Sequence, residues 1–301
     1  IRGRDIGTCN CTRSTPEHYH LPPRGQAHHL PGANDLQSRI TRFHDPDTQQ
    51  GTAPRSQRGQ SSSVLDMAYT GDYRGALWNA QGLFARRASR QSRKWEKVWE
   101  LLAHRDFLMI SETHSTPGKA DGVKNYISQQ GFHAYWSHGG HRRAGVGIII
   151  RKEFLDRFAS LSPQWIDIAT GESAALRLHG EHGNLDLFTI YLPTGNQGRQ
   201  DNSLFEQRCC IRSRMAQCQR SPSTALTILG GDFNYVTGKE ERWTKRTAEW
   251  SGLADAREEE DWDGKLGPKQ GLHELDQPHA THDSALARSR LTGCTPLNTR
   301  G

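Results

Sequence analysis

The chain has 301 residues, a formal net charge of +6 and an isoelectric point near 9.1. Its first thirty residues contain no apolar segment typical of a signal peptide, and no apolar run approaches the ~20 residues of a membrane span. We therefore expect an intracellular protein with no membrane partner. The six cysteines show no paired C-x-x-C spacing, so we assign neither a disulfide framework nor a zinc site to them.

The composition divides the chain into regions. Residues 1–62 contain no tryptophan and are crowded with Arg, His, Gln, Ser, Pro and Gly, whereas all eight tryptophans lie between Trp78 and Trp262. A segment so poor in apolar residues cannot bury enough surface to offset the entropy of its chain. We expect residues 1–72 to be a disordered, low-complexity segment and the packed core to begin near residue 73.

Basic residues are clustered within the expected folded part. The clusters comprise Arg86, Arg87, Arg90, Arg93, Lys94 and Lys97; His141, Arg142 and Arg143; and Arg208, Arg212, Arg214 and Arg220. Such clusters attract polyanions, so nucleic acid is a reasonable partner. On charge alone, the solvated face of a helix is the favoured interpretation of each single cluster. Nothing in the sequence indicates a protein partner.

The first expected elements are two strands that each end in a polar residue. A strand over 75–79 ends at Asn79, and a strand over 107–112 ends at Glu112. Between them, an apolar stripe at helical spacing predicts a helix whose tryptophans belong to the core. The stripe consists of Trp95, Val98, Trp99 and Leu102.

Further strands and helices follow in alternation. We expect strands over 133–136, 145–150, 174–178 and 185–191. The pattern Ser203-x-x-Glu206 has the form of a capping box, and the helix that it opens can turn Leu204, Ile211 and Met215 inward. Residues 242–250 and 252–260 are expected to be short helical or irregular pieces. Strands with intervening helices indicate an α/β (α+β) architecture of two sheets with flanking helices.

The most informative stretch runs from Ala225 to Tyr235. Its apolar run ends at Gly230-Gly231 and is followed by Asp232 and Asn234. In an extended chain these two polar side chains point to the same side, so a carboxylate and a carboxamide would converge. A Gly-Asp turn capped by Asn is the alternative interpretation of the same residues.

Together these motifs resemble the endonuclease/exonuclease/phosphatase superfamily. In chain order they are Trp-Asn79-Ala-Gln-Gly, Ile-Ser-Glu112-Thr-His, Gly145-Val-Gly-Ile, Ile-Tyr191-Leu-Pro-Thr-Gly and Gly-Asp232-Phe-Asn234. Residues 73–291 look like the endonuclease domain of non-LTR (LINE-type) retrotransposons, which is similar to abasic-site endonucleases and type I DNases. The resemblance implies a DNase I-like sandwich of two sheets. Sphingomyelinase-type, inositol-phosphatase and deadenylase branches remain open, and the basic charge favours nucleic acid as the substrate.

The resemblance also implies a role for each residue at a strand end. Glu112 would bind a divalent metal, and Asn79 would support that metal site or the phosphate. Asp232 would orient or deprotonate the attacking water, while Tyr191 would donate a hydrogen bond to a phosphate oxygen and Asn234 would steady the developing charge. Hard oxygen ligands suit Mg²⁺, or Mn²⁺ in vitro. Phosphodiester hydrolysis needs such a set because negative charge accumulates on the phosphate oxygens.

The end of the chain departs from the family pattern. Catalytically intact members close with a Ser-Asp-His element, but here Ser289-Arg-Leu291 is followed by Thr292-Gly-Cys-Thr-Pro, and His282-Asp283 comes too early. We therefore expect the last strands to be missing, residues 292–301 to be an unrelated tail, and the endonuclease to be weak or inactive. The alternative is a non-catalytic remnant that at most binds nucleic acid. An endonuclease acting on DNA would be nuclear.

Overall fold

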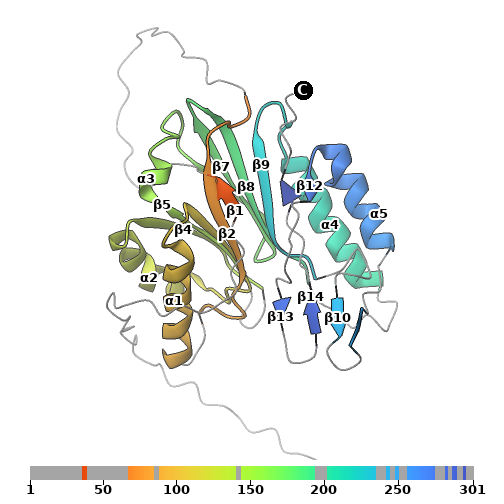
Figure 1. Ribbon diagram of the computed structural model, residues 1–301, viewed down its shortest axis with the longest axis horizontal. Helices are drawn as coiled ribbons and strands as arrows, with labels where there is room; N and C mark the ends of the chain where they lie inside the picture. Colours follow the sequence, from red (N-terminus) through yellow and green to blue (C-terminus); the bar gives the residue numbers. More distant parts are fainter. Residues whose placement is uncertain are drawn as a thin grey trace, which may run out of the picture.

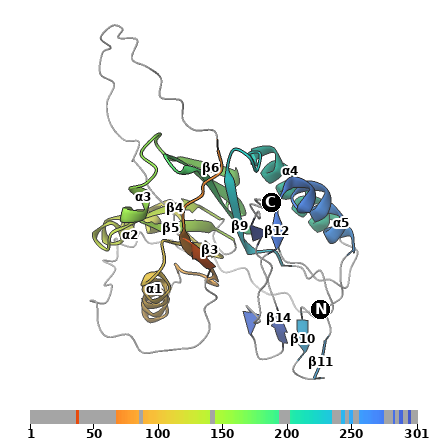
Figure 2. The ribbon, with the colours of Figure 1, turned by 45° about the horizontal axis from the view of Figure 1, so that its top comes forward.

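The computed structural model of the protein describes residues 36–38, 67–84, 88–139, 144–193, 202–234, 242–244, 248–250, 256–274, 282–283, 287–289 and 294–295. Two β-sheets lie face to face, and helices cover their outer faces (Figures 1 and 2). This arrangement confirms the expected α/β architecture of two sheets with flanking helices. Within the described residues, no helix is long and apolar enough to cross a membrane.

The first sheet has the strand order β1-β2-β3-β5-β4. Its strands are β1 (Leu36–Ser38), β2 (Tyr73–Asn79), β3 (Phe107–Ser111), β4 (Phe132–Ser137) and β5 (Val146–Arg151). Strands β2 and β3 are parallel, and the other pairs are antiparallel. The associated helices are α1 (Ala88–Leu102), α2 (Pro117–Gln129) and α3 (Lys152–Leu155).

The second sheet has the strand order β12-β15-β9-β8-β7-β6. Its strands are β6 (Gln164–Ala169), β7 (Ser173–Gly180), β8 (Gly183–Tyr191), β9 (Leu226–Asp232), β12 (His273–Glu274) and β15 (Cys294–Thr295). Strands β8 and β9 are parallel. Helices α4 (Asn202–Cys218) and α5 (Ala256–Lys265) lie outside this sheet, and the short 3₁₀ helix η2 (Pro268–Gln270) follows α5 (Figure 1).

A small third sheet lies below the two large ones in Figure 1. It is formed by β10 (Arg242–Thr244), β11 (Glu249–Trp250), β13 (His282–Asp283) and β14 (Ala287–Ser289). The sequence predicts short helical or irregular pieces over 242–250 and 252–260. This prediction is wrong for β10 and β11, and it is correct for residues 256–260, which belong to α5 (Ala256–Lys265). Two short strands of two and three residues carry too little alternating pattern to be recognised.

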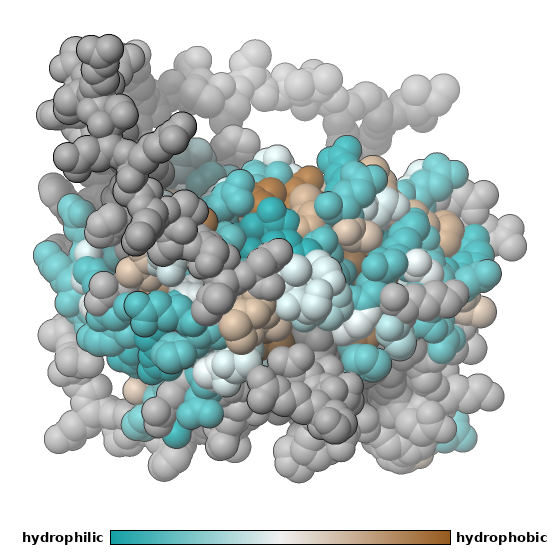
Figure 3. Space-filling model, turned by 90° about the horizontal axis from the view of Figure 1, so that it is seen from above, coloured by the Kyte–Doolittle hydropathy of each residue, from teal (hydrophilic) through white to brown (hydrophobic). Residues whose placement is uncertain are grey.

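Alternating side chains of the strands build two of the three main core layers. Phe107 and Met109 of β3 pack between the sheets, whereas Leu108 and Ile110 pack under α1 and α2. The expected stripe of α1 belongs to this second layer, with Trp95, Val98 and Leu102 buried and Trp99 half-buried. A third layer lies between the second sheet and α4 and α5. On the face in Figure 3, hydrophilic residues dominate the described surface.

Two segments contribute strands that the sequence does not predict. Strand β1 lies within the 1–72 region that we expect to be disordered, yet it pairs with β2. Strand β15 lies within the expected tail 292–301, yet Cys294 pairs with Leu229 of β9. The remainder of both regions, apart from residues 67–72, lies outside the described residues. Pairing with the edge of an existing sheet needs only backbone hydrogen bonds, so short strands of this kind have no composition signal.

Candidate active site

The carboxyl ends of the two parallel strand pairs meet at one end of the molecule. In the first sheet Asn79 of β2 is in register with Ser111 of β3, and in the second sheet Tyr191 of β8 is in register with Asp232 of β9. All four positions are the last residues of their strands. The parallel pairs thus deliver the polar residues predicted from the sequence to neighbouring positions.

The side-chain amide of Asn79 joins the two sheets. Its Nδ2 atom donates one hydrogen bond to Glu112 Oε1 at 2.9 Å and another to Asp232 Oδ2 at 2.5 Å. Carboxylates only accept hydrogen bonds, so the amide nitrogen must face them and the amide oxygen must face away. Oδ1 in turn accepts a hydrogen bond from the backbone N–H of Gln81 at 3.0 Å. One neutral side chain therefore holds two carboxylates together.

The position of the Glu112 carboxylate depends on an unusual backbone conformation. Alternation along β3 would turn residue 112 to the side of Leu108 and Ile110, away from the second sheet. The φ angle of Glu112 is 51°, in the left-handed region that non-glycine residues rarely adopt. This turn, which the Gly82 N–H stabilises by donating to the Glu112 carbonyl at 2.7 Å, brings the carboxylate to Asn79.

Gly230 allows the two sheets to approach each other beside the site. A Cβ atom on Gly230 would lie 2.2 Å from Leu77 Cδ2, so no larger side chain fits between β9 and β2 at this distance. Leu77 precedes Asn79 by two residues on the same face of β2. The close approach at Gly230 is what brings Asn79 within hydrogen-bond distance of Asp232. Gly231 is required for a different reason: its φ angle is 152°, and a Cβ atom there would lie 1.9 Å from the Ile190 carbonyl oxygen of the neighbouring strand.

The remaining two predicted residues lie next to Asp232. The backbone N–H of Asn234 donates to Asp232 Oδ1 at 3.1 Å, and its side-chain Nδ2 donates to the Leu192 carbonyl at 2.6 Å. Tyr191 is buried beside Val146 and Ala174. The structure therefore places Glu112 and Asp232 in contact with the same Asn79 amide. Asn234 lies beside Asp232 through a backbone hydrogen bond, and Tyr191 lies beside it through strand pairing.

The donor set at this site suits a hard divalent cation. Glu112 is partly exposed, with 23% of its side chain accessible, and Asp232 is 4% exposed. Mg²⁺ is commonly held by one or two carboxylates together with waters and substrate phosphates. Among the described residues, no group of three or more His, Cys, Asp or Glu side chains could hold a metal ion. The two carboxylates fit this mode of Mg²⁺ binding.

His114 borders the same carboxylate. Its Nε2 atom lies 4.0 Å from Glu112 Oε2, and its backbone is also left-handed, with φ at 53°. Burial lowers the pKa of His114, and the ammonium groups of Lys94 and Lys119 act in the same direction, whereas the Glu112 carboxylate opposes them. The imidazole is therefore neutral near pH 7 and can donate or accept a hydrogen bond at the edge of the site.

One of the predicted basic clusters does not form an exposed surface. Arg208 and Arg212 of α4 are 7% and 0% exposed, and both bind Glu258 of α5, at 2.8 and 2.6 Å. Arg220 binds buried Asp186 at 2.7 Å. The interpretation of this cluster as a nucleic-acid contact is wrong for these three arginines, because each is used to neutralise a buried carboxylate.

The other basic clusters are only partly described. Residues 86, 87 and 141–143 lie outside the described residues, and so does the side chain of Arg90. Lys94 points inward and donates hydrogen bonds to backbone carbonyls, whereas Arg93 is exposed. Single charges in a sequence do not reveal which side of a helix faces solvent. The sequence therefore does not predict that Lys94 is turned inward while its neighbour Arg93 is exposed.

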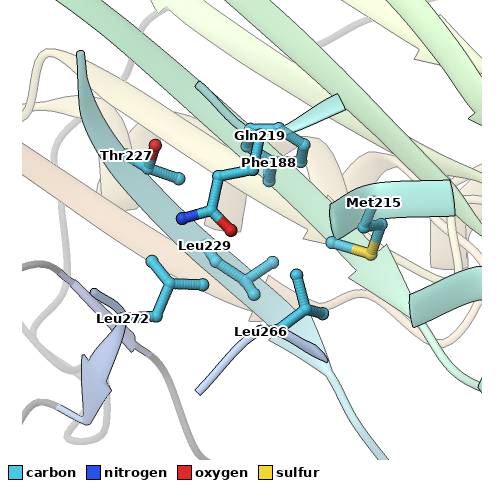
Figure 4. Close-up of a pocket in the computed structure, with 7 residues that line it drawn as sticks. All are labelled: Phe188, Met215, Gln219, Thr227, Leu229, Leu266 and Leu272. Atoms are coloured by element: carbon cyan, nitrogen blue, oxygen red, sulfur yellow. The ribbon is translucent and has the colours of Figure 1, made fainter. Parts of the chain in front are cut away.

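A small, mostly apolar pocket elsewhere in the molecule is lined by none of these residues. It lies between the second sheet, α4 and the segment after α5, and its labelled side chains converge in Figure 4. The lining residues are Phe188, Met215, Gln219, Thr227, Leu229, Leu266 and Leu272. The space is too narrow for a water molecule. It is a gap in core packing, and the strand-end cluster is the candidate site.

Solved structures of DNA-processing enzymes have the same fold. An AP endonuclease from Archaeoglobus fulgidus shares 13% identity and a TM-score of 0.51, with 74% of this chain and 86% of that chain covered. A 3′ phosphatase from Neisseria, bound to a product DNA hairpin, shares 14% identity and a TM-score of 0.51 over the same fractions. An AP endonuclease from Leishmania major shares 14% identity and a TM-score of 0.51 and covers 81% of this chain and 84% of its own.

No family model and no curated protein matches the sequence. The structural similarity, at these low identities, establishes that the protein has the DNase I-like fold of AP endonucleases, exonucleases and phosphatases. It agrees with the fold expected from the sequence motifs.

Proposed function

We propose that the protein is a Mg²⁺-dependent phosphodiesterase that nicks DNA. The observation that carries this proposal is the amide of Asn79, which binds Glu112 and Asp232 from two different sheets. Two carboxylates held this close repel each other unless a cation or a proton is shared between them. A bound Mg²⁺ would relieve that repulsion, neutralise charge on a scissile phosphate and lower the pKa of a coordinated water.

Each side chain of the site would have its own role in phosphodiester hydrolysis. Glu112, the more accessible carboxylate, would hold the metal. Asp232 is almost fully buried and already fixed by the Asn79 amide and the Asn234 N–H, so it would orient the attacking water and accept its proton. Asn79 would position both carboxylates, because its amide nitrogen donates a hydrogen bond to each of them. Tyr191 and Asn234 would contact the phosphate from the second sheet.

The lineage that we propose is the endonuclease of a non-LTR retrotransposon. It is supported by the order of the five motifs along the chain and by the net charge of +6. Such an enzyme would act in the nucleus. The genomic reading frame beyond Gly301 tests this lineage, because a retroelement would continue into a reverse transcriptase.

A plasmid-nicking assay tests the activity. We expect the wild-type protein to convert supercoiled plasmid to open circles slowly in Mg²⁺, in keeping with the weak activity expected from the sequence, and to stop when EDTA is added. Replacing Asp232 by Ala should slow nicking by about 100- to 1,000-fold, the usual cost of removing a group that acts in the transition state. Glu260→Ala, which changes an exposed carboxylate on α5, should nick at the wild-type rate.

Two outcomes would contradict the proposal. In one, the Asp232→Ala variant nicks as fast as the wild type. In the other, the wild type leaves the plasmid intact in Mg²⁺ and in Mn²⁺. If the intact plasmid is nevertheless retarded on a gel by the wild type, the protein is a non-catalytic domain that binds nucleic acid.

A further inference from the structure

Lys94 makes contacts that the proposed chemistry does not explain. It lies on α1, and its ammonium group donates hydrogen bonds to three successive backbone carbonyls, those of Ala80 at 2.5 Å, Gln81 at 2.6 Å and Gly82 at 2.9 Å. An ammonium group has three N–H donors. The ammonium group is thus directed at the turn that follows β2, and the side chain is half-buried there.

The turn needs this cation because its carbonyls converge. Gln81 and Gly82 both have left-handed backbones, with φ at 46° and 89°, so that three consecutive carbonyl oxygens point toward one spot. Three partial negative charges facing each other are unfavourable unless a donor lies between them. A compact ammonium fits such a three-way arrangement, whereas the planar fork of an arginine does not.

The same turn fixes the orientation of Asn79. The Gln81 N–H donates to Asn79 Oδ1 at 3.0 Å, and the Gly82 N–H donates to the Glu112 carbonyl at 2.7 Å. The first contact directs the Asn79 amide nitrogen at both carboxylates. The second stabilises the left-handed backbone that turns Glu112 inward. Both hydrogen bonds depend on the conformation of the turn that Lys94 holds.

We propose that Lys94 is a positioning residue for the phosphodiesterase site, acting through the 80–82 turn on Asn79 and Glu112. The expected change in kcat rests on the proposed function. The expected loosening of the 80–82 turn rests on backbone geometry alone. The lysine does not contact the substrate in this account. Its effect on the reaction therefore passes entirely through the residues whose orientation it sets.

The kinetic test uses Lys94→Met, which keeps the length of the side chain and removes its charge. We expect kcat for nicking to fall by about 10- to 100-fold, the scale of a small misplacement at a reacting centre, with KM within twofold of wild type. In an Asn79→Ala background, the same substitution should lower kcat by a smaller factor, because the contact through Asn79 is already lost and only the contact with the Glu112 carbonyl remains. Lys97→Met is the matched control, since Lys97 lies on the same helix and its ammonium group pairs with Glu100 at 2.7 Å.

A kcat unchanged in Lys94→Met, or a fall that is undiminished in the Asn79→Ala background, would overturn the proposal. Amide hydrogen exchange of the metal-free protein gives a readout independent of activity. The Gln81 and Gly82 amides should exchange at least about tenfold faster in Lys94→Met, while the amides of β9 keep their wild-type protection. Unchanged exchange at both positions would overturn the proposal even for an active enzyme. A wild type that does not nick would refute the proposed function, and the exchange result would still decide whether Lys94 holds the turn.

Discussion

At the interface of α4 and α5, buried charges are neutralised by one another, whereas at the strand ends two carboxylates share one neutral amide. Glu258 lies between Arg208 and Arg212, and all three are at most 8% exposed at their side chains. Glu112 and Asp232 instead share the Asn79 amide. Each region buries a carboxylate, Glu258 in one and Asp232 in the other, so burial alone does not distinguish structure from function.

The difference lies in how the charge is balanced. In the α4–α5 interface each carboxylate has basic partners from the facing helix, and the arrangement is complete within the chain. At the strand ends, the nearby Lys94 ammonium is directed at backbone carbonyls. A pair of carboxylates held together in this way is suited to a cation from solution. The predictions that follow use matched substitutions in the two regions.

The largest effect is expected for Glu258→Gln. This change removes the charge that Arg208 and Arg212 share and leaves two buried guanidinium groups without it. The free energy of unfolding should fall by about 3–5 kcal/mol, the usual cost of breaking a buried ion pair. Urea unfolding followed by circular dichroism measures it. The exposed Glu260→Gln on the same helix should stay within about 0.5 kcal/mol of wild type.

Gly230→Ala should have an intermediate effect. The added methyl group meets Leu77 and pushes β9 from β2, at a cost of about 1–3 kcal/mol in unfolding free energy. Because Asn79 and Asp232 are held across the same gap, nicking should also decrease. Gly264→Ala on α5, where a Cβ atom would meet nothing within 4 Å, is the control. It should leave stability unchanged or raise it by up to about 1 kcal/mol.

Of the three substitutions Glu258→Gln, Gly230→Ala and Glu112→Gln, the last is expected to change the free energy of unfolding least. The side chain can still accept a hydrogen bond from Asn79, and the repulsion between the two carboxylates disappears. Unfolding free energy should be unchanged or higher by up to about 1 kcal/mol, as is common when a functional charge is removed, while nicking is lost. A loss of stability comparable to that of Glu258→Gln would show that the two regions do not differ as described.

The smallest effect concerns acid pH at the α4–α5 interface. Burial alone would raise the pKa of Asp261, but hydrogen bonds from Lys265 and Arg212 outweigh it and lower the pKa below its ordinary value. A lowered pKa in the folded state stabilises the protein above the unfolded pKa of about 3.9, and this stabilisation is lost as pH falls through the folded pKa. The acid limb of a stability–pH curve should be shallower in Asp261→Asn than in wild type. An identical acid limb would contradict the pairing.

The sequence predicts the strand ends well because each combines an apolar run with a polar stop. Asn79, Glu112 and Asp232 all follow this pattern, and Gly230-Gly231 indicates where the apolar run of β9 ends. The sequence does not predict that Gly230 lies against Leu77 of the other sheet. It does not predict the left-handed turn at Glu112, since a glutamate carries no signal for a positive φ. Nor does it distinguish buried Arg208 and Arg212 from exposed arginines. Their burial depends on Glu258, which lies 50 residues further along the chain.

Titration of the metal-free protein with Mg²⁺ in a calorimeter tests the central claim most directly. The account predicts saturable binding to the wild type. It also predicts loss of that binding in a Glu112→Gln, Asp232→Asn double variant, while a Glu259→Gln, Glu260→Gln control on the exposed face of α5 binds like the wild type. Equal binding by the double variant and the wild type would contradict the claim that the Asn79-bridged carboxylates form a cation site.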